Sequence, residues 1–155
     1  MLKAIALARH ILPVEMIKDH QLETRTIDRG GEKEIRFVWY TRERVMPCWV
    51  DDQLQLVTWG CRRKEPSPSS VPLTQAVRLE SLQSGALEPW HPKVALVPAS
   101  AILVGRGVWI SMQEAGMLQA VVLLDGEKPR IYLLMVEADH YWHVMTGDTW
   151  MPLPS

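Results

Sequence analysis

The sequence predicts an α+β domain that is rich in strands, with an antiparallel sheet that wraps on itself or closes like a barrel, and only a few short helices. Apolar and polar residues alternate through most of the chain, which is the period of a strand. Glycine and proline interrupt this pattern at short intervals, as turns between strands require. The length of 155 residues, of which 47% are hydrophobic, suits one core, so we expect a single domain over residues 1–155.

The first half of the chain is predicted to contain a hairpin and a further strand. Glu23–Asp28 and Glu34–Tyr40 flank the sequence DRGG, whose glycines supply the positive φ angles of a tight turn. Leu54–Trp59 alternates again and ends at a Trp-Gly pair followed by a basic run. The segment KEPSPSSVP at 64–72 is expected to be an exposed loop, because proline suits neither a helix interior nor a central strand.

The second half is predicted to begin with a brief helix over Ser81–Leu87, which stops near Gly85 or at Pro89 because proline disfavours helix in the residue before it. DGEKP at 125–129 is a turn signal between two apolar runs, so we expect an antiparallel pair there. GRG at 105–107 is expected to be a turn or bulge. Strands are expected over residues 94–97, 102–104, 108–112, 118–124 and 130–138.

Charge and cysteine content narrow the classes of function. The formal net charge is -1 and the sequence pI is about 6.5, so any anion-binding site must be local. The two cysteines, Cys48 and Cys61, match no metal-ligand spacing and no disulfide framework, which favours a cytoplasmic location. No apolar run reaches the roughly 20 residues of a membrane span, and the opening segment lacks a signal-peptide cleavage pattern, so no membrane partner is expected.

The sequence contains no motif that requires a cofactor or a metal ion. His140 and His143 form an HxxH pattern inside a strand-like stretch, where a spacing of three directs the two side chains to opposite faces. Structural zinc is usually bound by closely paired Cys or His residues, and a glycine-rich phosphate loop is also missing. We therefore expect neither a metal nor a cofactor.

Tryptophan is unusually frequent, with seven residues against one phenylalanine. Trp39, Trp49 and Trp59 lie among several arginines in the sequence. Stacking of bases on indole rings, together with guanidinium contacts to phosphate, is typical of proteins that bind single-stranded nucleic acid. Tryptophans in sheets are also common core residues, so spacing alone leaves both interpretations open.

Several short motifs, in order along the chain, are similar to those of a known family. RFVWYTRE at 36–43, VMP at 45–47 and DDQLQLVTWG at 51–60 are similar to the family's RYNIAPTQ, its PV and its strand ending in MRWGLIP. QAVRLE at 75–80 is similar to INARAE, and KVALVPASAILV at 93–104 is similar to RCLIPADGFYEW. On these motifs the chain resembles the SOS response-associated peptidase (SRAP) family, as a divergent member.

The resemblance implies a domain that binds single-stranded DNA and forms a covalent link to abasic sites through a cysteine at its amino terminus. Position 2 of this chain is Leu2, so the family's autopeptidase and cross-linking activities are not expected. The family's asparagine falls on Ala76, its glutamate near Val104 and its histidine near Asp148. The resemblance therefore predicts an SRAP-like fold, a role in the response to DNA damage and binding of single-stranded or damaged DNA without the cross-link.

Four residues are predicted to contact single-stranded DNA, namely Trp59, Arg62, Arg63 and Arg78. Trp59 either stacks on a base or closes the core. Arg78 either binds a phosphate or pairs with Glu80, two positions along on the same strand face. Arg62 and Arg63 are expected to be exposed, on a phosphate or in a solvated turn. Structural roles near the site are expected for Glu80 and Pro98.

Two functions of other classes remain open. One is a thiol-dependent hydrolase or autopeptidase with a relocated nucleophile, for which Cys48 and Cys61 are the candidates. The other is a non-catalytic protein interaction module. No catalytic residue is assigned, and the sequence leaves the oligomeric state and any protein partner open.

Overall fold

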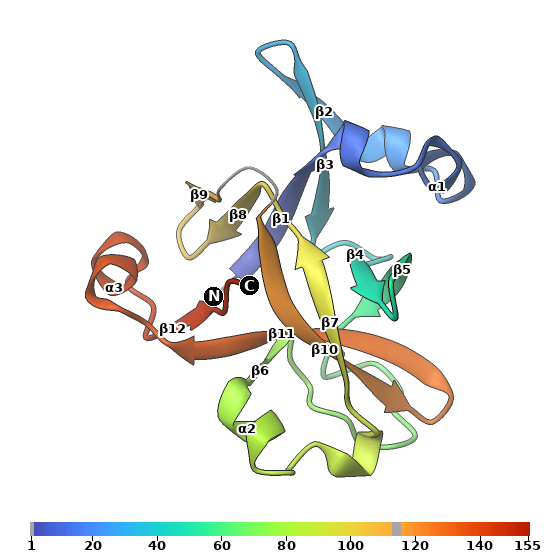
Figure 1. Ribbon diagram of the computed structural model, residues 1–155, viewed down its shortest axis with the longest axis vertical. Helices are drawn as coiled ribbons and strands as arrows, with labels where there is room; N and C mark the ends of the chain where they lie inside the picture. Colours follow the sequence, from blue (N-terminus) through green and yellow to red (C-terminus); the bar gives the residue numbers. More distant parts are fainter. Residues whose placement is uncertain (1, 113–115) are drawn as a thin grey trace.

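The computed structural model of the protein describes residues 2–112 and 116–155. They form a strand-rich domain with a few short helices, as the sequence predicts (Figure 1). The strands form two sheets, one of five strands and one of seven.

The larger sheet contains a closed ring of five strands. In this ring the order is β10, β7, β4, β5 and β11, and β11 pairs back onto β10. The ring is antiparallel except where β5 runs parallel to β11. Two short strands extend β11, β6 in parallel and β12 in antiparallel orientation. The bounds are β4 (Val45–Val50), β5 (Gln53–Trp59), β6 (Ala76–Arg78), β7 (Lys93–Pro98), β10 (Met117–Asp125), β11 (Lys128–Glu137) and β12 (Trp150–Pro152).

The smaller sheet has the order β2, β3, β1, β8 and β9, and each of its pairings is antiparallel. Figure 1 shows it above the ring, with the β2–β3 hairpin projecting away from the body. Its strands are β1 (Leu2–Ala8), β2 (Thr26–Arg29), β3 (Glu32–Val38), β8 (Ala101–Val104) and β9 (Val108–Ser111).

The helices are short and lie at the periphery of the two sheets (Figure 1). Three of them lie between β1 and β2, two lie between β6 and β7, and one separates β11 from β12. The elements are η1 (Arg9–Ile11), α1 (Val14–Asp19), η2 (Leu22–Arg25), α2 (Leu79–Gln83), η3 (Glu88–Trp90) and α3 (His140–Thr146).

The core joins the two sheets. Its main cluster includes Ile5 and Phe37 from the smaller sheet together with Met46, Trp59 and Ile131 from the ring. A second cluster, around Tyr132 and Leu134, lies beneath α2. Burial of this apolar surface is the main favourable term in folding.

Most of the predicted elements are confirmed. The hairpin around DRGG is β2–β3, and DGEKP joins the antiparallel pair β10–β11. GRG at 105–107 forms the turn between β8 and β9, and the segment 64–72 contains no helix or strand. The brief helix predicted over Ser81–Leu87 is α2, which begins two residues earlier and ends at Gln83.

Two predictions about secondary structure are wrong. The predicted strand Glu23–Asp28 begins only at Thr26, because Glu23–Arg25 belong to η2. The stretch with His140 and His143 is helix α3 instead of a strand, because the Asp139 side chain caps its first turn by accepting from the Trp142 amide at 2.7 Å. Gly147, with φ +75, ends the helix in the left-handed conformation. The predicted barrel-like closure is present in the larger sheet, whose pairings are antiparallel apart from those of β5 and β6 with β11.

Candidate nucleic-acid interface

Trp59, the last residue of β5, lies in the core. Its side chain is 0% exposed, and its indole Nε1 donates to the Gln75 carbonyl oxygen at 3.0 Å. The ring meets that of Trp39 edge to face, with centroids 5.3 Å apart. The prediction that Trp59 stacks on a base is therefore corrected: both faces of the indole are covered, and Trp59 closes the core.

The chain leaves β5 through Gly60, which no other residue could replace without strain. Its φ is +56, and a Cβ built there would lie 2.3 Å from the Thr74 carbonyl oxygen. This close approach brings the returning segment before β6 against the end of β5. In the Trp-Gly pair, Trp59 therefore fills the core and Gly60 allows the two backbone segments to lie close together.

The basic run after Gly60 divides into a structural arginine and exposed cations. The Arg62 guanidinium donates to the carbonyl oxygens of Trp39 and Thr41, the latter at 2.8 Å, and lies 5.5 Å from the Trp39 ring centroid. Arg62 is half-buried, which corrects the prediction that it is exposed. Arg63 is exposed, as predicted.

A buried ionic network, which we call the Arg130 network, lies at the same end of β5. It contains Arg44, Glu65, Asp125 and Arg130. Arg130 donates to Asp125 at 2.9 Å and to the Gly60 carbonyl oxygen at 2.9 Å, and lies 3.4 Å from Glu65. Arg44 donates to the Trp59 carbonyl oxygen at 2.8 Å and pairs with Glu65. Both arginines are nearly fully buried, so their charges are held away from solvent.

The protein environment shifts the pKa values within this network. Burial, reinforced by the charges of Arg62 and Arg130, lowers the pKa of Arg44 to about 10, so it stays cationic at neutral pH. Burial alone would raise the pKa of Asp125. The hydrogen bonds from the Ser69 amide, the Ser67 hydroxyl and Arg130 outweigh burial and hold that pKa below its ordinary value.

The Arg130 network also fixes the loop between β5 and β6. Asp125 accepts hydrogen bonds from the Ser67 hydroxyl at 2.9 Å and from the Ser69 amide at 3.0 Å. The Trp90 indole donates to the Ser69 carbonyl oxygen at 2.6 Å, and the Tyr132 hydroxyl donates to that of Pro72 at 2.9 Å. The loop predicted from proline and serine is therefore tied to the body at several points.

The other predicted site residues lie away from Trp59. Arg78 is exposed and stacks on the Trp150 ring, with its guanidinium carbon 4.1 Å from the centroid. The alternative in which Arg78 pairs with Glu80 on one strand face is wrong, because β6 ends at Arg78 and Glu80 belongs to α2. Arg78 pairs with Met135 and Trp59 with Ile131, so the two side chains are about four strand positions apart along β11. Pro98 is buried at the end of β7.

The positions that the resemblance singles out come together around the start of β1. Leu2 is buried and pairs with Val104, and the Gln75 side-chain amide donates to the Leu2 carbonyl oxygen. A Cβ built at Gly105 would lie 3.2 Å from the Thr146 carbonyl oxygen, and a cleft of about 470 Å³ beside it is lined partly by Arg106 and Asp148. Gln75, which contacts Leu2, is the neighbour of Ala76, the position that corresponds to the family's asparagine.

The two cysteines are core residues. Cys48 is 0% exposed, and burial raises the pKa of its thiol to about 12. Cys61 is also fully buried. An enclosed thiol is a poor nucleophile, because reaction requires a thiolate that a substrate can reach.

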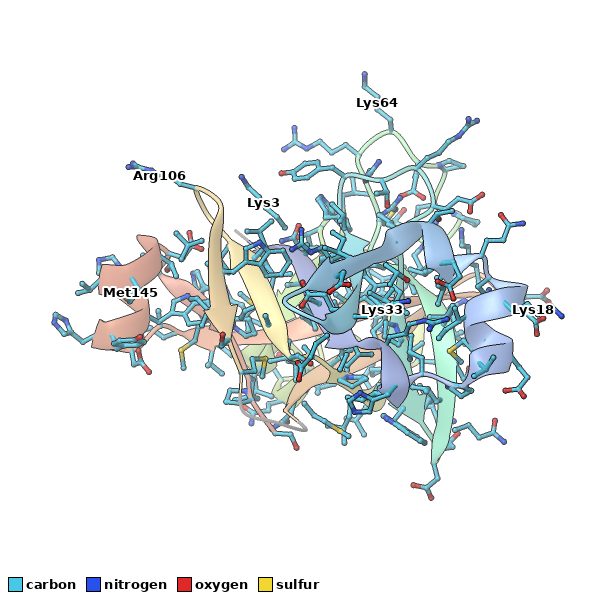
Figure 2. All side chains as sticks on the ribbon, turned by 90° about the horizontal axis from the view of Figure 1, so that it is seen from above. Lys3, Lys18, Lys33, Lys64, Arg106 and Met145 are labelled. Carbon is cyan, nitrogen blue, oxygen red and sulfur yellow. The ribbon has the colours of Figure 1, made fainter. Side chains whose placement is uncertain are left out.

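Cationic side chains point to one side of the molecule, which we call the basic face; Lys64 and Arg106 are exposed, and Lys3 is half-buried. Lys3, Lys64 and Arg106 point to the same side in Figure 2, although they come from β1, the loop after β5 and the β8–β9 turn. Lys3 lies at a β-bulge, where the register shifts between Leu2 and Ala4. Next to Lys64 in the chain lies the exposed Arg63. Tyr40, in the loop after β3, is 60% exposed.

Within residues 2–112 and 116–155, no cluster of three His, Cys, Asp or Glu side chains could hold a metal ion. In the same residues, no helix has the length and apolar character needed to cross a membrane. Comparisons with protein-family models, with curated proteins and with solved structures found no match.

Sequence reasoning missed the Arg130 network and Gln75. A signal for the network was present: Asp125 and Arg130 are charged residues at the ends of two long apolar strands, the first opening the DGEKP turn and the second directly following it. Such residues are buried when they pair with each other. Nothing in the local pattern indicates that Gln75 reaches Leu2, because the two residues are 73 positions apart.

Proposed function

We propose that this protein is a divergent SRAP-like protein that binds single-stranded DNA non-covalently, in the cytoplasm, through its basic face. The observation that carries the proposal is that Lys3, Lys64 and Arg106 project to one side from three separate segments (Figure 2). Phosphate contacts of this kind supply most of the affinity for nucleic acid that does not depend on base sequence. Since the net charge is -1, binding depends on this local cluster.

The surroundings of Leu2 support the link to the SRAP family. The resemblance assigns catalytic groups to positions at or near Leu2, Val104 and Asp148, and these lie in one neighbourhood. Leu2 carries no thiol, and Gln75 uses its amide to hold the Leu2 backbone. The proposal is therefore binding of DNA without the family's covalent link.

An exposed aromatic side chain lies in the loop that Arg62 holds, since Tyr40 stands between Trp39 and Thr41, whose carbonyl oxygens accept from Arg62. Tyr40 is 60% exposed, whereas Trp59 is fully buried. Stacking of a base on an exposed aromatic ring adds affinity with little dependence on sequence. Tyr40 thus takes the role that the sequence assigned to Trp59. The Arg130 network and Arg62 fix the backbone of the loops that carry Tyr40, Arg63 and Lys64.

The alternative of a thiol-dependent hydrolase has less support. It requires a reactive thiolate, but Cys48 and Cys61 are both buried and the pKa of Cys48 is raised to about 12. Alkylation of the folded protein tests it. We expect neither cysteine to react until denaturant is added, and rapid labelling of the native protein would favour the hydrolase.

Fluorescence anisotropy with a labelled thymidine oligonucleotide tests the proposal. Affinity should fall as salt rises from about 50 to about 200 mM, with a slope of about -0.7 log units per phosphate contact. Lys64→Ala and Arg106→Ala should each reduce that slope by about one contact, and Tyr40→Ala should cost about 1–3 kcal/mol without changing it. Lys18→Ala is the matched control, because Lys18 lies at a distant end of the molecule in Figure 2. No binding at low salt, or an equal loss in the control, contradicts the proposal.

An oligonucleotide with an abasic site tests the non-covalent part separately. Without a thiol at Leu2, we expect no adduct that survives heating and denaturing electrophoresis. A stable adduct would show that this chain cross-links by another group. Borohydride trapping would reveal a transient imine formed by an amine.

A further inference from the structure

An apolar groove lies at the opposite end of β5 from the basic face. It has a volume of about 550 Å³ and lies between the β4–β5 turn, β7 and α2. Its apolar lining includes Trp49, Leu79, Leu82, Val94 and Leu96. We call it the Trp49 groove.

The Trp49 groove exists because the short helix α2 covers only part of this face of the ring. Beneath α2, Tyr132 and Leu134 are buried in the second core cluster. Beyond it, Trp49 remains 36% exposed and Val94 remains 69% exposed. β4 and β7 pair at Trp49 and Leu96, and both side chains line the groove. Exposed apolar side chains that gather in this way are typical of interaction sites.

The rim of the Trp49 groove is acidic. Asp51 and Asp52 form the β4–β5 turn, and both line the groove. Asp51 pairs with Lys93, but both side chains of this pair are largely exposed. Asp52 makes no hydrogen bond or ion pair with the rest of the described chain. The rim therefore favours cationic groups and disfavours phosphates.

We infer that the Trp49 groove is a docking site for a basic amphipathic helix of a partner protein. The apolar side chains of such a helix recur at intervals of three and four, and would occupy the groove around Trp49 and Val94. Its Lys and Arg side chains would face Asp51 and Asp52. Trp49 is the anchor, since a partly exposed tryptophan in a pocket is a frequent hot spot of binding. The inference is independent of DNA binding, which uses the other end of β5.

A designed peptide tests this inference without knowledge of the natural partner. The probe is a fluorescein-labelled helix of about 15 residues, with leucines on one face and lysines on the other. A second peptide carries glutamate in place of each lysine. We expect anisotropy titrations to show binding of the lysine peptide, and at least tenfold weaker binding of the glutamate peptide.

Variants locate the site. Trp49→Ala should weaken binding of the lysine peptide about tenfold or more. Val94→Lys, at a mostly exposed position where folding is not at risk, should do the same by adding a positive charge and removing an apolar contact. Asp52→Asn should cause a smaller loss. Tyr141→Ala is the control, because Tyr141 is 66% exposed on α3 and does not line the groove.

Several results would overturn the inference. These are a failure of the lysine peptide to bind, equal binding of the glutamate peptide, or no effect of both Trp49→Ala and Val94→Lys. Sedimentation that shows a dimer of this chain dissociated by Trp49→Ala would assign the groove to a second copy instead. Trp49→Ala should leave oligonucleotide binding unchanged, so failure here is distinguishable from failure of the proposed function.

Discussion

The same types of residue lie around the two ends of β5, but they are buried at one end and exposed at the other. At one end Trp59 is fully buried, and Arg130 and Asp125 form a buried ion pair. At the other end, about 20 Å away along the strand, Trp49 is 36% exposed and Asp51 and Lys93 form an exposed pair. Burial decides whether a tryptophan closes a core or offers a contact surface, and whether an ion pair is structural or available. Residue type alone does not determine either of these roles.

The largest effect is expected from breaking the buried pair. Arg130→Ala leaves Asp125 buried without its cation and removes the donor to the Gly60 carbonyl oxygen. Loss of one partner of a buried pair typically costs about 3–5 kcal/mol of unfolding free energy. Urea unfolding measures it. Arg63→Ala, an exposed arginine at the same end of β5, should change that free energy by less than about 0.5 kcal/mol.

An equal loss in both arginine variants would contradict this view, because it would mean that the burial of Arg130 is not what makes it structural. A loss below about 1 kcal/mol for Arg130→Ala would show that Asp125 finds solvent once its partner is removed.

A smaller effect is expected from the tryptophans. Trp59→Phe removes the hydrogen bond from Nε1 to the Gln75 carbonyl oxygen and leaves unfilled space in the core. Together these should cost about 1–3 kcal/mol. Trp49→Phe at the exposed end should cost about 0.5 kcal/mol or less. Thermal unfolding of the two variants compares them, and similar losses would contradict the assignment of Trp59 alone to the core.

Local pattern was enough to predict the hairpins and β5, since alternation and turn residues such as Gly31 and Gly126 act over a few positions. It was not enough to decide the burial of Trp59. Leu54 and Leu56 lie on one face of β5, and Val57 and Trp59 lie on the other. Because both faces carry apolar residues, the pattern does not show which face is buried. The parallel pairing of β5 with β11 is formed by segments far apart in the chain, and no local signal specifies it.

The candidate site was predicted less well than the fold, for the same reason. Arg44 and Glu65 are 21 positions apart, and Glu65 and Arg130 are 65 apart, so the Arg130 network exists only after folding. The helix α3 is different, because Asp139 and Gly147 are recognisable cap residues at its two ends. A strand was expected because the apolar run of β11 leads directly into it.

The next effect is a change in how the free energy of unfolding depends on pH below about 4. The pKa of Asp125 is lowered on folding, so the folded protein binds this proton less readily than the unfolded chain. Its stabilising contribution is complete above the ordinary carboxyl pKa of about 4, and is lost as the pH falls through the lower folded pKa. The unfolding free energy of Asp125→Asn should therefore depend less steeply on pH below about 4. Urea unfolding at several pH values measures this.

Asp52→Asn at the other end of β5 is the control for the acid experiment. Asp52 is exposed and makes no hydrogen bond or ion pair with the rest of the described chain, so this variant should follow the wild-type pH dependence. If Asp125→Asn also follows it, the hydrogen bonds from Ser67, Ser69 and Arg130 do not stabilise the charged form.

The smallest effect is expected for the pair between Asp51 and Lys93. Its side chains are 68% and 54% exposed, and exposed pairs contribute about 0.2–1 kcal/mol that salt screens. A double-mutant cycle with Asp51→Asn and Lys93→Ala should give a coupling in that range, well below the coupling of Asp125 with Arg130. A coupling as large as that of the buried pair would contradict the comparison. A weak pair matters for the Trp49 groove, because Asp51 can then exchange Lys93 for a cation of the partner helix at little cost in free energy.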